Sequence, residues 1–439
     1  MLKKFFSFAA LLACVSSYAL NGKLFFTLAP NVEDEFAHIM PYRPPHVPFV
    51  GKCVRNQPVM LHLVLANPAT GKDGKVLVEI ESIKSIEPDG KVKELVEPGK
   101  PVVALQGVKK NKGDFSGVML ANFYMTMIAE DGDQLGKMRM TVRLRDKGDG
   151  STLELSDEIE LVETLPGVPE KPMSFEEMSR FLTGYYKNPD PAKIPAAFAA
   201  FLEFDNENRG IKRSYDPLMW VCGFAELYKL NPQLRPELVK SAAKCSFVHK
   251  GYVALILAAA GATDAELEGA DPKLREMFVK AKNMKESPLA FDKVTSPAQL
   301  DALWVMFLTT GKFEPIRRLV YEVRRRDDAM PVAEIKKLGR KPTKEEMPKV
   351  MNGLVAGAAE WSLASNAKQH ELVGFYLEAM LMRRQYPDDA AAAKIGGMLM
   401  SAGLVKMADK PGGGKVLKPV LKPVGKTPPP KVGYNPLGD

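Results

Sequence analysis

Histidine, cysteine and tryptophan are scarce in this sequence, and their scarcity excludes several classes of protein. The 439 residues include five histidines, four cysteines and three tryptophans. No two histidines stand at the spacing of metal ligands, so we expect no metal ion and no other cofactor. No glycine-rich phosphate loop precedes a predicted helix, and past the amino terminus no apolar run reaches the roughly 20 residues of a membrane-spanning helix.

The four cysteines do not suit a disulfide framework. Cys14 lies in the amino-terminal segment, which leaves an odd number, Cys53, Cys222 and Cys245. Cys222 and Cys245 fall on neighbouring predicted helices. They either form one bridge in an oxidising compartment or remain two buried thiols, and the sequence leaves both alternatives open.

Positive charge is concentrated at the two ends of the chain. The formal net charge is +8, but two lysines near the amino terminus and an excess of four lysines over aspartates beyond residue 408 account for +6 of it. The residues between these ends are close to neutral. A basic nucleic-acid-binding protein is therefore not indicated.

The first 19 residues predict export. Two lysines precede an apolar run over residues 5–15, and small residues up to Ala19 complete the pattern of a secretory signal that is cleaved after Ala19. In a second interpretation, Leu11–Cys14 is a lipobox and Cys14 becomes a lipidated amino terminus. The protein would then be an outer-membrane lipoprotein rather than a soluble protein of the periplasm or cell surface, and we expect membrane association only in that case.

The amino-terminal half of the mature chain predicts an arm followed by a β domain. Residues 20–50 are expected to form an extended arm, because four prolines between residues 41 and 48 oppose helix formation. Residues 51–163 read as about seven or eight short strands separated by turns, which is typical of an antiparallel immunoglobulin-like β-sandwich.

The clearest strands lie at the end of this domain. Residues 123–127 and 138–144 predict a hairpin around the turn at 130–133, and a second turn at 147–150 leads into a last strand over 153–161. On the strand before this second turn, methionine, valine and leucine alternate with arginine and threonine. One face of that strand is therefore expected to lie in the core and the other in water.

A proline-rich joint precedes a long helical domain. Residues 164–172 include three prolines and form a stiff connection. Ser174 then opens the first helix, and Glu177 stands where it completes a capping box. Over residues 173–408 apolar residues recur at intervals of three and four residues, which predicts ten or more helices in an α-solenoid-like array. The three tryptophans are expected to be core residues between these helices.

The last segment of the chain, residues 409–439, is rich in lysine, proline and glycine and is predicted to be disordered. It is either a solvated terminus or a tether to an anionic partner.

Two groups of residues in the helical domain are candidates for a functional site. The first is an arginine cluster, which we interpret either as a solvated helix face or as an anion-binding edge for polysaccharide or phospholipid. Its members are Arg317, Arg318, Arg324, Arg325 and Arg326. The second is a pair of carboxylates, Glu360 beside Trp361 and Glu378 on the following helix, which are candidates for an acid and a base.

We therefore predict an exported bacterial envelope protein that acts as a non-enzymatic binding or scaffold module for a protein or an envelope polymer. Both domains supply broad surfaces, and neither shows a pocket with converging polar groups. The alternative is a hydrolase that acts on cell-envelope polymer through carboxylates in a groove of the helical domain. The two hypotheses differ in whether a groove holds two carboxylates about 5–10 Å apart.

Overall fold

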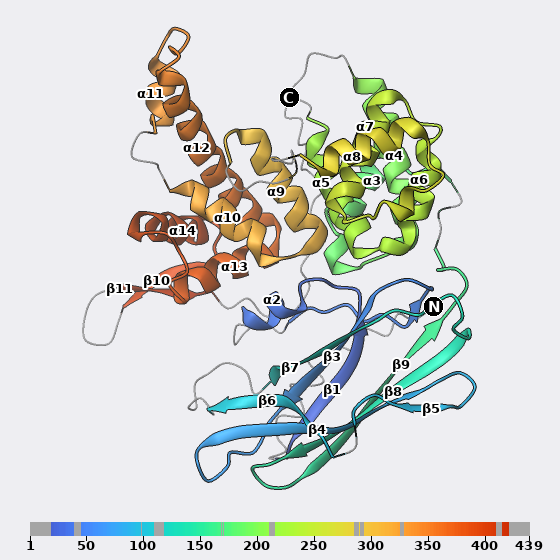
Figure 1. Cartoon of the computed structure of the whole chain (residues 1–439). Helices are drawn as coiled ribbons and strands as arrows, with labels where there is room; N and C mark the ends of the chain where they lie inside the picture. The colour runs from blue at the N-terminus through green and yellow to red at the C-terminus, as the bar shows by residue number, and fades with distance from the viewer. Residues whose placement is uncertain are drawn as a thin grey trace. The chain divides into compact units, whose positions relative to one another are not determined.

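The computed structural model describes residues 19–38, 45–97, 99–108, 118–167, 169, 171–209, 216–284, 289, 294–324, 329–409 and 415–420. The chain forms two compact units, one from the described parts of residues 1–170, 187–194 and 230–236 and one from the rest. β-Sheets make up the amino-terminal half and helices most of the carboxyl-terminal half (Figure 1), which confirms the predicted order of the two classes. None of the described helices is long and apolar enough to cross a membrane.

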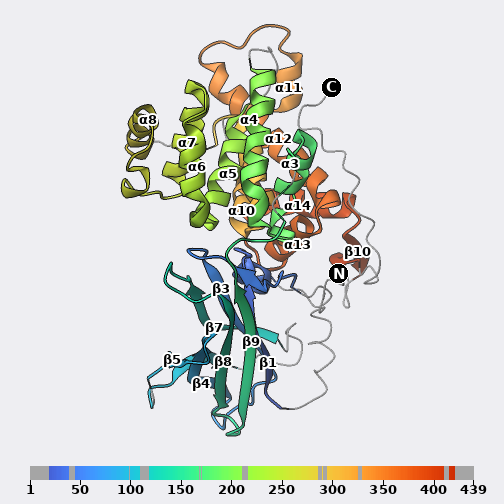
Figure 2. The same ribbon diagram turned by 90° about the vertical axis from the view of Figure 1, so that its right-hand side faces the viewer.

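Two sheets form the β-rich unit and lie face to face over one hydrophobic core (Figure 1 and Figure 2). One sheet has the order β1-β3-β7, and the other has the order β2-β9-β8-β4-β5 with β6 also paired to β4. The strands are β1 Asn21–Thr27, β2 Lys52–Cys53, β3 Val59–Ala66, β4 Lys75–Ile86, β5 Val92–Glu94, β6 Val102–Val108, β7 Val118–Met127, β8 Gly136–Asp146 and β9 Thr152–Leu161. The core contains alternate residues of both sheets because successive side chains of a strand point to opposite faces.

The predicted alternation on β8 is confirmed. Met140, Val142 and Leu144 are each 0% exposed. On the outer face, Arg139 forms an ion pair with Glu158 of the neighbouring strand. β8 pairs antiparallel with β9 across the turn at 147–150, as predicted.

The hairpin predicted between residues 123–127 and 138–144 is wrong. β7 pairs with β3 in one sheet, whereas β8 pairs with β4 and β9 in the other. The turn at 130–133 therefore carries the chain from one sheet to the other. The alternating pattern shows which side chains point inward. It does not show whether two strands with inward-facing residues are neighbours in one sheet or face each other from two sheets.

The extended arm over residues 20–50 is also a wrong prediction. β1 is paired along its length with β3, and the helix α2 (Val32–Ala37) follows it. Leu24 and Phe26 enter the core between the sheets, while Phe25 enters a smaller cluster beside α2 on the other face. A strand buried on both faces has a continuous apolar run rather than an alternating one, and the prolines downstream of residue 40 do not affect it.

The helical unit begins where the capping box predicts. Ser174 accepts a hydrogen bond from the Glu177 N–H, and the Glu177 carboxylate accepts one from the Ser174 N–H. The helices are α3 Phe175–Leu182, α4 Ile194–Asn208, α5 Leu218–Leu230, α6 Arg235–Ala242, α7 Phe247–Ala259, α8 Pro272–Lys282, α9 Pro297–Thr310, α10 Phe313–Val323, α11 Val332–Lys337, α12 Glu346–Gln369, α13 Glu371–Met382 and α14 Asp389–Ser401. Short 3-10 turns cover Tyr185–Lys187, Pro191–Lys193, Pro232–Leu234 and Ala265–Leu267.

The three tryptophans do not share one environment. Trp220 of α5 and Trp304 of α9 are each 2% exposed in the helical core, as predicted. Trp361 of α12 is 70% exposed, so its assignment to the core is wrong. The buried stripe of α12 runs through Ala359 and Leu363. Trp361 is two residues from both and therefore projects from the opposite side of the helix.

The prediction of disorder from residue 409 onwards is wrong for part of that segment. β10 (Val405–Asp409) pairs antiparallel with β11 (Lys415–Pro419). Leu417 of β11 lies against Gly396 of α14. Contacts of this kind with a folded neighbour offset the conformational entropy that a lysine- and proline-rich segment loses when it becomes ordered. A prediction from composition does not include these contacts. Residues beyond 420 lie outside the described part of the chain.

Candidate functional site

A groove with a volume of about 600 Å³ lies within the helical unit. Its walls are α12, α14 and the segment that leads into α11. The residues that line it are Met330, Pro331, Val332, Gly353, Ala356, Gly357, Glu360, Trp361, Ala364, Lys394, Gly397, Met398 and Ser401. They are mostly small or apolar, with a few polar groups between them.

The face of α12 toward the groove carries glycines that allow close packing. A methyl group at Gly353 would overlap the backbone carbonyl oxygen of Met330, and one at Gly357 would contact Val332. The Met330 N–H also donates a hydrogen bond to the carbonyl oxygen of Lys349, at 2.9 Å. The segment before α11 is therefore held directly against α12, and this contact builds one wall of the groove.

The opposite wall comes from α14, whose groove-lining residues recur at three and four along the helix. The Lys394 ammonium donates to the Glu360 carboxylate at 2.6 Å and to the carbonyl oxygen of Val323 at 3.4 Å. The Lys394 and Glu360 side chains are 28% and 45% exposed, so water screens the pair and it adds little stability. Both groups remain within reach of a ligand in the groove.

Trp361 stands on the rim of the groove beside this ion pair. It is the most exposed of the large hydrophobic side chains among the described residues. A flat indole face that is open to water, next to apolar walls such as Val332 and Met398, is typical of a contact surface rather than of a packed core.

The chemistry available in the groove is stacking and hydrogen bonding. Among the described residues that line it, Glu360 is the one carboxylate, and none is a histidine or a cysteine. Glu378 of α13 is 5% exposed and does not line the groove. The structure therefore does not bring the two predicted carboxylates together in this groove.

Of the three described arginines in the predicted cluster, Arg317 and Arg324 are paired within the chain. The Arg317 guanidinium donates to both oxygens of Glu314, which raises the pKa of Arg317, and Arg324 forms an ion pair with Asp388 at 3.3 Å. Arg318 is half-buried. These pairs weaken the case for an anion-binding edge. Arg325, Arg326 and the lipidation candidate Cys14 lie outside the described residues.

The cysteines of the helical unit are free thiols. Cys222 is buried and Cys245 is partly buried, and burial raises the pKa of both thiols. The two residues are thus free thiols, of which Cys222 is buried as the second alternative expects and Cys245 only partly so, and both sulfurs remain protonated and poorly nucleophilic at neutral pH.

A buried polar cluster joins α4 to α7. The Asp205 carboxylate accepts hydrogen bonds from His249 Nε2 at 2.9 Å and from the Arg209 guanidinium. The side chains of Asp205 and His249 are 2% and 3% exposed. Neither residue lines the groove, so we interpret the cluster as a structural link between two helices.

Sequence reasoning identified Glu360 as a candidate, but it placed the neighbouring Trp361 in the core and missed the rest of the groove. Two signals were present. Gly353 and Gly357 stand four residues apart on one helix, which indicates close approach of another backbone. Lys394 is the one charged residue between positions 390 and 400, in an otherwise apolar and small-residue stretch.

Comparisons with known proteins do not assign the chain to a family. No family profile matches it, and no curated protein sequence does. Among solved structures, a family 123 glycoside hydrolase from Clostridium perfringens, studied for glycolipid glycan hydrolysis, is similar over 44% of this chain and 36% of that chain. The identity is 8% and the TM-score is 0.20, and a likeness at this level carries no argument about fold or function.

Proposed function

We propose that this chain is an exported, non-enzymatic binding or scaffold protein of the bacterial cell envelope, and that the groove between α12 and α14 holds its ligand. The observation that supports this most is Trp361, 70% exposed on the rim beside the Glu360–Lys394 pair. An indole face stacks on the apolar face of a sugar ring, while the paired groups can exchange their mutual hydrogen bond for bonds to hydroxyls. The proposed ligand is a saccharide unit of an envelope polymer.

The two halves of the molecule suit this role as broad surfaces. We propose that the β-rich unit is an immunoglobulin-like sandwich and that the helices form a solenoid-like array. Two sheets around a shared core and a succession of helices support these assignments.

A hydrolase that acts on the same polymer is the alternative. It requires a second carboxylate about 5–10 Å from Glu360 within the groove. Glu378 does not line the groove, so the geometry supports binding better than hydrolysis. Release of reducing ends from peptidoglycan by the purified chain, abolished in Glu360→Gln, would show that the alternative is right.

Replacing Trp361 with alanine is expected to weaken binding to insoluble peptidoglycan about tenfold or more, because exposed tryptophans in contact surfaces carry a large share of binding free energy. Co-sedimentation of the purified chain with peptidoglycan measures this affinity.

The matched control is Phe247→Ala. Phe247 is 64% exposed on α7, belongs to the same unit and does not line the groove. Its replacement should leave sedimentation unchanged. Equal losses in both variants, or no loss in Trp361→Ala, would contradict a role for the groove.

Export is the second component of the proposal, and the mature amino terminus tests it. Cleavage after Ala19 would leave the described β-rich unit intact, because Leu20 is its first core residue and β1 begins at Asn21. Mass spectrometry of the protein from its natural source should therefore find Leu20 at the amino terminus. A diacylated Cys14 would instead establish the lipoprotein alternative, and a retained Met1 would rule out both.

A further inference from the structure

A second cavity, of about 210 Å³, lies between the two sheets of the β-rich unit. Its walls include the buried apolar side chains of Phe26 of β1, Val59 of β3 and Ile159 of β9, which are all at most 2% exposed. Engineered apolar cavities of about 150 Å³ bind benzene. This cavity is therefore large enough for a small organic molecule.

One end of the cavity holds a buried amide with an unused donor. Gln57 is 1% exposed, and its Oε1 accepts a hydrogen bond from the Val54 N–H at 3.1 Å. This bond fixes the orientation of the amide, because the reverse orientation would place N–H donors against an N–H donor. Gln57 Nε2 has no hydrogen-bond partner among the described residues. Buried donors are nearly always satisfied, so this donor calls for an acceptor, and the cavity that Gln57 lines is the space in which one can lie.

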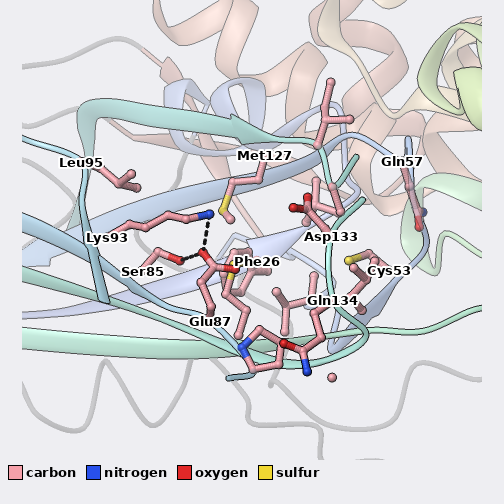
Figure 3. A pocket seen from close by; sticks show the side chains of 18 residues that line it. Phe26, Cys53, Gln57, Ser85, Glu87, Lys93, Leu95, Met127, Asp133 and Gln134 are labelled. Carbon is pink, nitrogen blue, oxygen red and sulfur yellow. Dashed lines mark hydrogen bonds and ion pairs between the residues drawn. The ribbon is translucent and has the colours of Figure 1, made fainter. Parts of the chain in front are cut away.

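Figure 3 shows Cys53 on the same side of the cavity as Gln57 and Ser85, Glu87 and Lys93 on the opposite side, with Asp133 and Gln134 between them. Burial raises the pKa of the Cys53 thiol to about 11, so this sulfur stays protonated and acts as a small apolar neighbour. It offers Gln57 no strong acceptor.

The polar groups at the far end satisfy one another. Ser85 donates to the Glu87 carboxylate at 2.9 Å, and the Lys93 ammonium lies 3.4 Å from the same oxygen (Figure 3). Leu95 and Ile128, which also line the cavity, are 46% and 52% exposed and provide apolar surface toward solvent. Among the described residues that line this cavity, Gln57 Nε2 is the one buried polar side-chain atom without a hydrogen-bond partner.

We propose that this cavity binds a small, mainly apolar molecule, of the size of a substituted benzene or a short acyl chain, whose carbonyl oxygen accepts a hydrogen bond from Gln57 Nε2. The apolar walls determine the size and hydrophobic character of the ligand, and the amide determines the position of its oxygen. The site is separate from the groove of the helical unit and does not depend on the function proposed for it.

Two probes of nearly equal shape test the proposal. Acetophenone carries a carbonyl oxygen where α-methylstyrene carries a methylene group. Methyl NMR of the methionine-labelled full chain should show shifts at Met127 and Met138, which line the cavity, and none at Met398 in the groove. Acetophenone should bind about tenfold more tightly than α-methylstyrene, which is the typical effect of one buried hydrogen bond.

Two variants separate the contribution of the amide from that of the cavity. Gln57→Leu should lower the affinity for acetophenone to that for α-methylstyrene or below it, because the buried carbonyl oxygen would have no donor, and should leave the affinity for α-methylstyrene unchanged. Val59→Phe places a ring in the cavity and should abolish binding of both probes. If Gln57→Leu does not fold, the preference of the wild-type chain for acetophenone still decides the role of the donor.

Three results would overturn the proposal. Failure of both probes to bind the wild-type chain would mean that water alone occupies the cavity and satisfies Gln57. Equal affinity for the two probes would show that Gln57 Nε2 does not bind a carbonyl oxygen of the ligand. Shifts at Met398 without shifts at Met127 and Met138 would place the binding in the groove instead.

Discussion

Replacing Gly353 with alanine is expected to lower the free energy of unfolding of the helical unit by about 3 kcal/mol, at the upper end of the usual cost of overpacking. The added methyl group would overlap the carbonyl oxygen of Met330. That backbone cannot move freely, because the Met330 N–H is hydrogen-bonded to Lys349. The wall before α11 must therefore separate from α12, so the groove should lose its ligand as well. Denaturant unfolding monitored by circular dichroism measures the first effect.

The same substitution on the facing helix is the control. No atom lies within 4 Å of a methyl group placed at Gly397 of α14. Alanine favours a helix over glycine by about 1 kcal/mol, so Gly397→Ala should stabilise the chain. If both variants unfolded at the same denaturant concentration, the close contact between α12 and the segment before α11 would not exist.

Loss of the Asp205 carboxylate is expected to cost about 3 kcal/mol, because it removes the acceptor and the negative charge of a buried charged network. His249, at 3% exposure, would keep only its contact with the Arg209 guanidinium, whereas Arg209, at 35%, can still reach water. Asp205→Ala should therefore unfold at a distinctly lower denaturant concentration than the wild-type chain. Asp205→Asn, which keeps one acceptor oxygen, should lose less.

Glu207→Ala provides the comparison for Asp205, since Glu207 lies on the same helix and is exposed. Its replacement should change the free energy of unfolding by no more than about 0.5 kcal/mol. A loss for Asp205→Ala of the same size would mean that the cluster does not join α4 to α7.

The pattern of apolar residues predicted which face of a strand is buried more reliably than it predicted which strands pair with each other. On β8 the alternation correctly placed Met140 and Val142 in the core. It could not show that β7 belongs to the opposite sheet, because inward-facing residues look alike whether their neighbour lies beside them or across the core. β1 was missed for a related reason, since a strand buried on both faces does not alternate.

Helices were predicted well where proline or a cap marks their first turn. The helix α3 follows the predicted cap at Ser174, and α8 and α9 begin at Pro272 and Pro297, where the missing donor of proline costs no hydrogen bond. The short helix α11 has six residues and no strong periodicity, so no local pattern revealed it. Its position depends on the contact of Met330 with Gly353, which joins segments whose proximity only the fold establishes.

Only part of the candidate site could be predicted from the sequence. Glu360 was singled out as a candidate acid or base beside an aromatic residue, whereas Trp361 itself was expected in the core. The partner of Glu360 is Lys394 of α14, thirty-four residues further along the chain. Local spacing carries no information about such a partner, and for the same reason it could not show that Glu378 does not line the groove.

Trp361 fluorescence tests the central claim most directly, because Trp220 and Trp304 are each 2% exposed and an aqueous quencher therefore reaches mainly Trp361. Soluble peptidoglycan fragments should shift the emission to shorter wavelengths and protect it from acrylamide, as a sugar ring covers the indole. The Trp361→Phe variant should show neither change. Fragments that bind the wild-type chain without altering either the emission or its quenching would contradict the assignment of the groove as the ligand site.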